Sequence, residues 1–238
     1  MTFITRFAPS PTGHLHLGHA YSALLAFDMA QLAQGRFLLR IEDTDQERSK
    51  AAYESQIYSD LEWLGISWET PVLRQSQNMP AYDTALDTLA DMGLLYPCSC
   101  TRGDIRRATS APQEGAPLLG PDGLIYPGTC RHRKWSGRTD KDAVRLDMQK
   151  AVDTLTALPS YVETGLHSQI NVTRSHLINE VGDIVLARRD TKTAAYHLSV
   201  VVDDAAQDVT HVIRGEDLAI ATPIHVLLQA LLKLPTPT

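Results

Sequence analysis

The sequence predicts an α/β fold in which a parallel sheet is interrupted by an insert. The chain opens with strand, helix and strand patterns over residues 1–7, 18–34 and 37–41, and this order begins a parallel sheet. Strand-like runs return near the other end of the chain, at 184–187, 198–202 and 209–213. Between these two parts, residues 95–137 hold all three cysteines and many prolines and glycines, with little helical periodicity.

Each of the first three expected helices has an apolar face and a glycine just past its end. Their ranges are 18–34, 49–64 and 80–92, and the glycines are Gly35, Gly65 and Gly93. A last helix over 222–232 is expected to begin with Thr222 as its capping residue and Pro223 at its first helical position. The three consecutive valines at 200–202 make 198–202 the strongest of the later strand patterns.

Composition excludes several classes of protein. The 238 residues, 43% of them hydrophobic, can bury a sizeable core, which excludes intrinsic disorder. No apolar run approaches the roughly 18 residues of a membrane helix, so a cytoplasmic protein without membrane contact is expected. The net charge of -6 means that any RNA contact needs a local basic patch. Three cysteines argue for a metal site or free thiols, and against a disulfide framework.

The loop after the first strand is a candidate phosphate site. Residues 8–13 read Ala-Pro-Ser-Pro-Thr-Gly, and His16-Leu-Gly-His19 follows where the first helix begins. A helix N-terminus offers free N–H groups to phosphate, and Gly18 leaves room near the backbone. From these residues alone, a tight turn carrying two surface histidines is an equally good interpretation.

Longer sequence motifs decide between these two interpretations, because they resemble the motifs of a known family. They are Arg6-Phe-Ala-Pro-Ser-Pro-Thr-Gly13, His16-Leu-Gly-His19, Arg40-Ile-Glu-Asp-Thr-Asp45, Tyr196 with Val200-Val-Val-Asp-Asp204, and Val212-Ile-Arg-Gly-Glu-Asp217. Together they resemble the glutamyl-tRNA synthetases, which are class I aminoacyl-tRNA synthetases. The resemblance implies a Rossmann-like class I synthetase catalytic domain with an inserted α+β subdomain that bears a zinc site. Its halves would be 1–97 and 183–238, with the zinc-bearing and acceptor-contacting insert at 98–182.

The resemblance also implies two sets of site residues. The glutamate set is Arg6, Ala8, Ser10, Glu42, Tyr196 and Arg214. The ATP set is His16, Gly18 and His19, with the two histidines catalytic and ATP accompanied by Mg²⁺. Arg6 and Arg214 would hold the side-chain carboxylate, and Glu42 with Tyr196 the α-ammonium group. This charge pattern suits an amino acid that carries an extra carboxylate.

The cysteines suggest a structural zinc site that needs four ligands. Cys98, Cys100 and Cys130 supply three of them. On ligand chemistry alone the fourth is His132. The short relatives in the family instead have Tyr-x₃-Cys here, with tyrosine as the fourth ligand, while full-length enzymes can have Cys-x-His. We therefore expect Tyr126 to complete the site.

The insert also carries a cluster of basic residues, which is the natural place for RNA phosphates; a solvated charged face is the alternative. They are Arg102, Arg106, Arg107, Arg131, Arg133, Lys134 and Arg138.

The chain lacks two parts of a full glutamyl-tRNA synthetase. These are the helical anticodon domain and the lysine-containing "KMSKS" loop. Residues 233–238 read as a linker, so we expect the sequence to be a fragment that ends just before that loop; loss of the loop is the alternative. The resemblance is therefore to a short paralogue that activates L-glutamate without tRNA and attaches it to the queuosine base at the wobble position of tRNA(Asp). A monomer is expected. The alternatives are a truncated enzyme that charges tRNA(Glu), and a catalytically impaired glutamate-binding paralogue.

Overall fold

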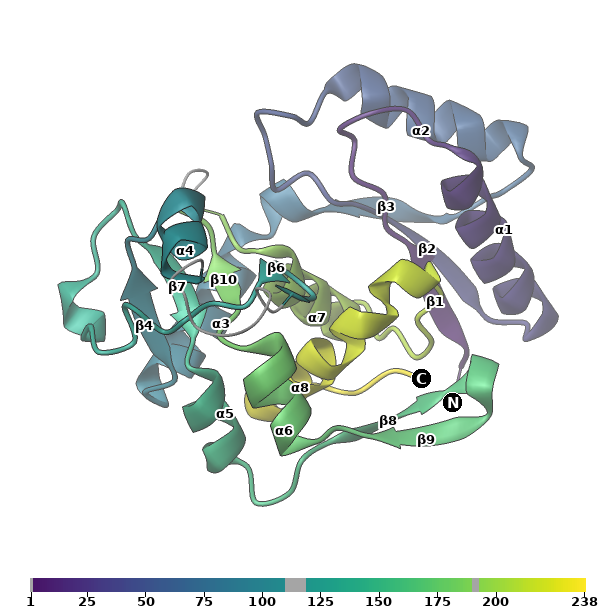
Figure 1. Ribbon diagram of the computed structural model, residues 1–238. Coiled ribbons are helices and arrows are strands. Elements are labelled where there is room, and N and C mark those ends of the chain that lie inside the picture. The colour runs from purple at the N-terminus through teal and green to yellow at the C-terminus, as the bar shows by residue number, and fades with distance from the viewer. Residues whose placement is uncertain (1, 110–118, 190–192) are drawn as a thin grey trace.

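The structure of the protein, a computed structural model, describes residues 2–109, 119–189 and 193–238 (Figure 1). Residues 110–118 of the expected insert therefore lie outside the described residues. The N-terminal elements are β1 (Ile4–Phe7), α1 (Leu17–Leu32), β2 (Arg36–Ile41), α2 (Ala51–Trp63), β3 (Glu69–Arg74), α3 (Met79–Asp91) and β4 (Leu95–Cys98). The middle elements are α4 (Arg102–Thr109), β5 (Leu119–Gly120), β6 (Gly123–Leu124), β7 (Ala143–Leu146), α5 (Met148–Thr154), β8 (Ser160–Glu163), β9 (Ser168–Asn171) and α6 (Arg174–His176). The C-terminal elements are β10 (Val185–Ala187), α7 (Tyr196–Ala206) and α8 (Thr222–Leu232).

The expected parallel opening is confirmed. β1 pairs with β2 and β2 with β3, all parallel, in the order β1-β2-β3. Apolar side chains of β1, β2, α1 and α2 form one core, which includes Phe7, Leu39 and Leu61, and α1 and α2 lie beside this sheet in Figure 1. The sequence patterns did not predict β3, which contains Pro71 and lies at a sheet edge, where a residue without an N–H is tolerated.

A second sheet is antiparallel and joins distant parts of the chain. Its order is β10-β7-β4. The larger core packs around this sheet and draws on α3, α5, α7 and α8, with Leu89, Leu146 and Leu227 among its fully buried members. Two short hairpins, β5-β6 and β8-β9, and an isolated antiparallel bridge between Ala187 and Ala194 add further pairing.

The prediction of a strand over 198–202 was wrong, because this run is part of helix α7. Leu198, Val200 and Val201 are buried in the larger core, and His197, Ser199, Asp203 and Asp204 of α7 are buried too. A helix buried on nearly all sides has a continuous apolar run, which by pattern alone looks like a buried strand. Burial therefore outweighs the β-propensity of the valines.

The strand expected over 209–213 is also absent from the described structure. The segment instead runs beside β1. The N–H groups of Thr210 and His211 donate to the carbonyl of Ile4, and the N–H of Val212 donates to the carbonyl of Thr238. Its apolar residues serve a small core in which Val209 contacts the β1–β2 pair.

Helix α8 lies where the sequence predicts it, but Thr222 is its first residue and not its cap. The capping position is Ala221, which makes no side-chain capping bond. The hydroxyl of Thr222 instead accepts a hydrogen bond from Arg214. In the part of the chain that the structure describes, no helix is both long and apolar enough to span a membrane.

Candidate active site

A pocket of about 470 Å³ opens beyond the carboxyl ends of β1 and β2, where open α/β sheets bind ligands. Its walls come from the end of β1, the loop 8–16, the first turn of α1, the residue after β2, the start of α7 and the segment 213–218. The loop is held by two backbone hydrogen bonds, from Glu42 to Pro9 and from Lys50 to Pro11, each 3.0 Å long. All the residues expected in the glutamate and ATP sets line this one pocket: Arg6, Ala8, Ser10, His16, Gly18, His19, Glu42, Tyr196 and Arg214.

His16 and His19 cap helix α1 together. Nδ1 of His16 accepts from the N–H of Gly18 at 3.2 Å, and Nδ1 of His19 accepts from the N–H of His16 at 3.3 Å. The two rings stack with centroids 3.8 Å apart. Because each Nδ1 accepts from a backbone donor, the neutral ring carries its proton on Nε2. Burial, and then the nearby His16, lower the pKa of His19. The capping role of this pair was not foreseen from the sequence.

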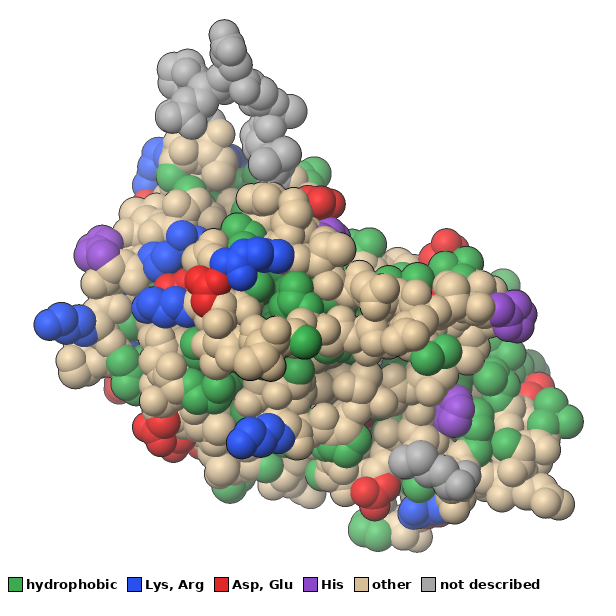
Figure 2. Space-filling view, turned by 90° about the horizontal axis from the view of Figure 1, so that it is seen from below, with side chains coloured by type: hydrophobic (Ala, Val, Ile, Leu, Met, Phe, Trp, Pro, Cys, Tyr) green, Lys and Arg blue, Asp and Glu red, His purple; other side chains and the backbone are tan. Residues whose placement is uncertain are grey.

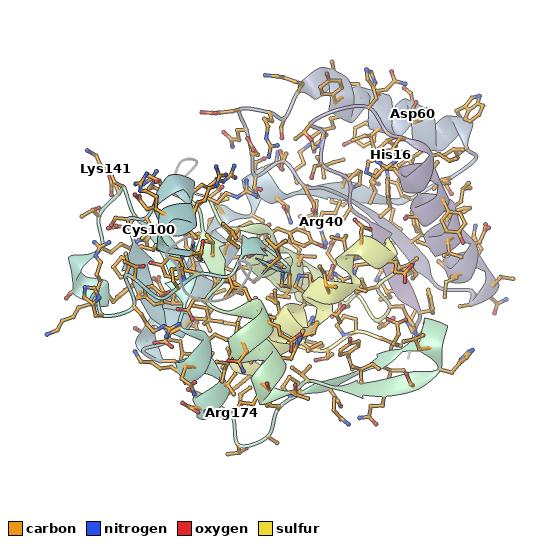
Figure 3. All side chains as sticks on the ribbon, viewed as in Figure 1. His16, Arg40, Asp60, Cys100, Lys141 and Arg174 are labelled. Carbon is orange, nitrogen blue, oxygen red and sulfur yellow. The ribbon has the colours of Figure 1, made fainter. Side chains whose placement is uncertain are left out.

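Gly18 allows this arrangement by lacking a Cβ. A Cβ at this position would lie 3.1 Å from Cε1 of His16, a tight contact with the capping ring. The His16 ring therefore occupies the space beside the Gly18 backbone that we expected a ligand to use. Figure 3 shows His16 at this end of α1, with Arg40 in the interior of the molecule.

Arg6 is fixed by a buried carboxylate that the sequence patterns did not assign. Its Nε and Nη2 donate to the two oxygens of Asp204 at 2.9 and 3.2 Å. Arg40 also donates to Asp204, from Nη1 at 2.7 Å. Burial opposes the charge of Asp204, but the two guanidinium groups outweigh it and lower the pKa of this carboxyl to about 2. Asp204 thus orients Arg6, while Arg40 sits behind the pocket wall with no exposed surface.

Asp203 faces the other way on α7. Its carboxylate accepts hydrogen bonds from Gln75, Asn78 and Tyr82, at distances between 2.8 and 2.9 Å. Asp203 is fully buried, and burial raises its pKa, with Arg40 the largest opposing influence. One signal could have revealed this network, because Arg40 interrupts an otherwise apolar strand and a buried arginine needs a carboxylate.

Glu42 and Tyr196 add a carboxylate and a phenol to the pocket that Arg6 and Arg214 also line. Burial raises the pKa of Glu42, while the charges of Arg40 and Arg6 oppose this shift. Burial also raises the pKa of Tyr196, and the charge of Glu42 adds to the effect, so the phenol stays protonated. The pocket therefore offers the Glu42 carboxylate and the Tyr196 hydroxyl beside two guanidinium groups, and Asp217 adds a second carboxylate to its lining.

Arg214 is held by neutral partners on the first turn of α8. Its Nη2 donates to Oγ1 of Thr222 at 2.5 Å, and its Nη1 lies 3.0 Å from Nδ1 of His225. This contrasts with Arg6, whose partner is a carboxylate. Within the described ranges, Arg214 makes no ion pair, so its positive charge is left for the pocket.

The three cysteines gather at the far side of the molecule from His16 (Figure 3). Their Sγ atoms all lie within 4.8 Å of one another, with Cys100 and Cys130 3.5 Å apart. The phenol oxygen of Tyr126 lies 3.3 Å from the Sγ atoms of Cys98 and Cys100. A tetrahedral zinc ion with Zn–S bonds of about 2.3 Å separates its sulfur ligands by about 3.8 Å, so these four donors fit zinc. His132 is exposed and does not belong to the cluster.

A guanidinium group supports negative charge on these donors. Arg145 lies over the ring of Tyr126, 3.9 Å from its centroid, and its Nε donates to Sγ of Cys98 at 3.4 Å. Burial alone would raise the pKa of Cys130, but hydrogen bonds, first from Tyr126 and then from the Ser99 backbone, lower it to about 6. Zinc binds cysteine as thiolate, and Cys130 is shifted toward that form, whereas burial raises the pKa of the Cys100 thiol to about 11.

The basic residues of the insert are only partly available to a partner. Arg131 pairs with Asp183 at 2.8 Å, and Arg133 pairs with Asp142 at 2.5 Å. Arg138 lies over the ring of Trp135. On the face shown in Figure 2, Lys and Arg side chains still gather at the end of the molecule where Figure 1 places β4 and β7. The patch is thus a mixture of internal ion pairs and exposed cations.

Comparison with known proteins agrees with this fold. The family model described as "tRNA synthetases class I (E and Q), catalytic domain" matches residues 2–238. The protein is therefore built as a class I tRNA synthetase catalytic domain. The crystal structure of a glutamate-tRNA synthetase from Elizabethkingia anophelis superposes with a TM-score of 0.79 at 27% identity, covering 100% of this chain and 49% of that one.

Curated relatives show to which family of class I tRNA synthetases the chain belongs. The Glutamyl-Q tRNA(Asp) synthetase of Rhodobacter capsulatus is 56% identical over 236 residues, which cover 98% of this chain and 84% of the relative. The Glutamate–tRNA ligase of Aquifex aeolicus is 38% identical, but this chain spans only 47% of its length. The chain belongs to the glutamyl-Q tRNA(Asp) synthetase family.

Proposed function

We propose that the protein activates L-glutamate with ATP, without tRNA, and transfers it to the queuosine base at the wobble position of tRNA(Asp). The observation that carries this proposal is the single pocket that brings together Arg6, Arg214, Glu42 and the histidine pair of α1. The tRNA named for the Rhodobacter capsulatus relative supports the choice of acceptor.

The charges of the pocket match those of glutamate. Arg6 and Arg214 would hold the side-chain carboxylate, because a guanidinium fork binds both oxygens of a carboxylate. Glu42 would accept the α-ammonium group, with the Tyr196 hydroxyl beside it. Ala8 and Ser10 would line the same space. The cationic charge needed for selection comes chiefly from Arg214, because Arg6 already faces Asp204.

Activation requires no nucleophile from the protein. An oxygen of the glutamate α-carboxylate attacks the α-phosphorus of ATP, and the bond from that phosphorus to the pyrophosphate oxygen breaks. The rate then depends on alignment and on stabilisation of the leaving charge. The Nε2–H groups of His16 and His19, at the N-terminus of the 16-residue helix α1, would bind these phosphates. Mg²⁺ bound to ATP would add positive charge there.

Transfer then joins glutamate to a hydroxyl of the cyclopentene-diol of queuosine. The hydroxyl oxygen attacks the activated carbonyl carbon, the bond from that carbon to the phosphate oxygen breaks, and AMP leaves. A diol of this shape is similar to the ribose diol that related enzymes acylate. Exposed cations of the insert would contact RNA phosphates.

The cysteine cluster would hold one structural Zn²⁺ through Cys98, Cys100, Tyr126 and Cys130. The distances among these donors support this set, and His132 serves as a matched control. Zinc analysis of freshly purified protein should find one equivalent per chain. Tyr126→Phe should lose most of the metal and His132→Ala should keep it; the reverse result would assign the fourth ligand to His132.

The first test of the function is glutamate-dependent ATP–pyrophosphate exchange without tRNA. Exchange is expected, and Arg214→Ala should abolish glutamate binding in calorimetry. Glu69 is exposed and does not line the pocket. Glu69→Gln is therefore the matched control and should catalyse exchange at the wild-type rate. Transfer of labelled glutamate should then occur to tRNA(Asp) with queuosine and not to the same tRNA without it. Labelling of tRNA(Glu) instead would favour a charging enzyme.

A further inference from the structure

A row of four side chains runs from the molecular surface to the pocket. Arg214 in the pocket wall lies 3.0 Å from Nδ1 of His225, and Nε2 of His225 lies 3.0 Å from Nδ1 of His197. Nε2 of His197 lies 2.8 Å from Oδ1 of Asp122. Asp122 belongs to the turn between β5 and β6 in the middle of the chain, whereas His225 is on α8. The row thus joins two segments far apart in sequence.

The two ends of this row fix the direction of all its hydrogen bonds. A guanidinium group only donates, and an ionised carboxylate only accepts. Nδ1 of His225 must therefore accept from Arg214, which leaves the proton of His225 on Nε2, donating to His197. His197 in turn accepts on Nδ1 and donates from Nε2 to Asp122. Every ring nitrogen is used once, and both imidazoles are neutral.

The surroundings of the row favour this neutral state. His197 and His225 are 5% and 6% exposed, so water competes little for their hydrogen bonds. Burial, followed by the nearby His197 and the charge of Arg214, lowers the pKa of His225 well below its ordinary value. Burial opposes the charge of Asp122, but the hydrogen bond from His197 outweighs it and lowers the pKa of that carboxyl.

The turn that carries Asp122 is itself closely packed. A Cβ on Gly120 would lie 2.5 Å from the carbonyl oxygen of Glu180, so the β5-β6 hairpin approaches the turn Leu177–Val181 at a distance that only glycine permits. Asp122 is therefore set on an anchored hairpin, although its side chain is 47% exposed.

We propose that Asp122, His197 and His225 are positioning residues that orient the Arg214 guanidinium for the side-chain carboxylate of the substrate while leaving its charge unneutralised. This inference rests on the proposed role of Arg214 in glutamate binding. A carboxylate directly on Arg214 would fix the fork equally well, but it would compete with the substrate. The row places that carboxylate two imidazoles away, and Thr222 fixes the other branch of the fork.

Asp122 provides the sharpest test, because it lies at the surface and its replacement leaves the core intact. Asp122→Asn keeps a carbonyl oxygen that accepts from His197, so KM for glutamate in the exchange reaction should stay within about twofold of the wild type. Asp122→Ala removes the acceptor at the end of the row and should raise KM for glutamate about fivefold, the equivalent of one hydrogen bond of about 1 kcal/mol. KM for ATP should not change in either variant.

The protonation pattern is a second readout that needs no substrate. Long-range ¹H–¹⁵N spectra of the histidine-labelled protein should show the His197 and His225 rings neutral and protonated on Nε2. Unchanged KM for glutamate in Asp122→Ala, or a proton on Nδ1 of either ring, would overturn the inference. Absence of exchange in the wild type would refute the proposed function, while the spectra would still decide the geometry of the row.

Discussion

Replacing Asp204 by asparagine should lower the free energy of unfolding by about 3 kcal/mol. The Asp204 carboxylate is 4% exposed and contacts two guanidinium groups, those of Arg6 and Arg40, which are 4% and 0% exposed. Asparagine keeps the shape and one acceptor oxygen but not the charge. The variant leaves two buried cations with less compensation, although Arg40 keeps the carboxylates of Glu42 at 3.5 Å and Asp203 at 3.8 Å.

Two estimates give the size of the expected loss in the free energy of unfolding. The shift of the Asp204 pKa from 3.8 to about 2 is worth about 2 kcal/mol of stability at neutral pH. Removing one partner of a buried ion pair costs about 3–5 kcal/mol, because the other charge stays buried. Asparagine retains part of the hydrogen bonding, so a value near the lower end of the second range is expected.

Urea denaturation at pH 7 measures this difference. For a slope of about 3 kcal/mol per molar urea, the midpoint should fall by about 1 M. The matched control is Glu69→Gln, which removes a bidentate carboxylate from Arg36 in a pair that is 46% and 44% exposed and should cost less than about 1 kcal/mol. Equal losses in the two variants would show that burial does not decide the strength of these pairs.

Three further results are expected. Because the pKa of Asp204 is lower in the folded protein, the contribution of its carboxylate to the free energy of unfolding is complete above about pH 4 and is lost as the pH falls through about 2. The difference in stability between wild type and Asp204→Asn should therefore be constant from pH 5 to 8 and narrow below pH 4. A difference that widened in acid would contradict this assignment. His19→Asn keeps an acceptor for the helix cap but removes the Nε2–H, so the exchange rate should fall about 10²-fold with unchanged helix content by circular dichroism, whereas a normal rate would remove His19 from the phosphate site. Tyr82→Phe takes one donor from buried Asp203 and should cost about 2 kcal/mol in urea denaturation; an unchanged midpoint would contradict this role of Tyr82.

The sequence predicted the first half of the fold well because its signals are local. Gly65 and Gly93 follow the second and third helices at positive φ, whereas after α1 Gln34 takes the left-handed position and Gly35 comes one residue later. The strand-loop-helix-strand order needs no distant contact to be recognised. The predicted pocket residues come together for a similar reason, since the motifs that carry Arg6, His16 and Glu42 follow or begin elements of one parallel sheet, whose strand ends meet at one edge.

The parts that were mispredicted depend on distant contacts. The run at 198–202 is helical because its surroundings bury it on nearly every side, which no short window of sequence contains. The same holds for side chains behind the pocket: Asp204 is 198 residues from Arg6, and Asp122 is 75 residues from His197. Arg131 and Arg133 look like RNA-binding residues in the sequence, but Asp183 and Asp142 already pair with them.

The adjacent carboxylates of α7 have a consequence for how the molecule unfolds. Asp204 binds the arginines of β1 and β2, whose strands belong to one core, while Asp203 binds Tyr82 of α3, which belongs to the other. Neither core can separate from α7 without exposing a buried charge, so the two should melt together in one cooperative transition. A ligand in the pocket touches Arg6 from one side of this junction and Tyr196 from the other. Its binding energy should therefore slow amide exchange in both cores, including parts that it does not contact.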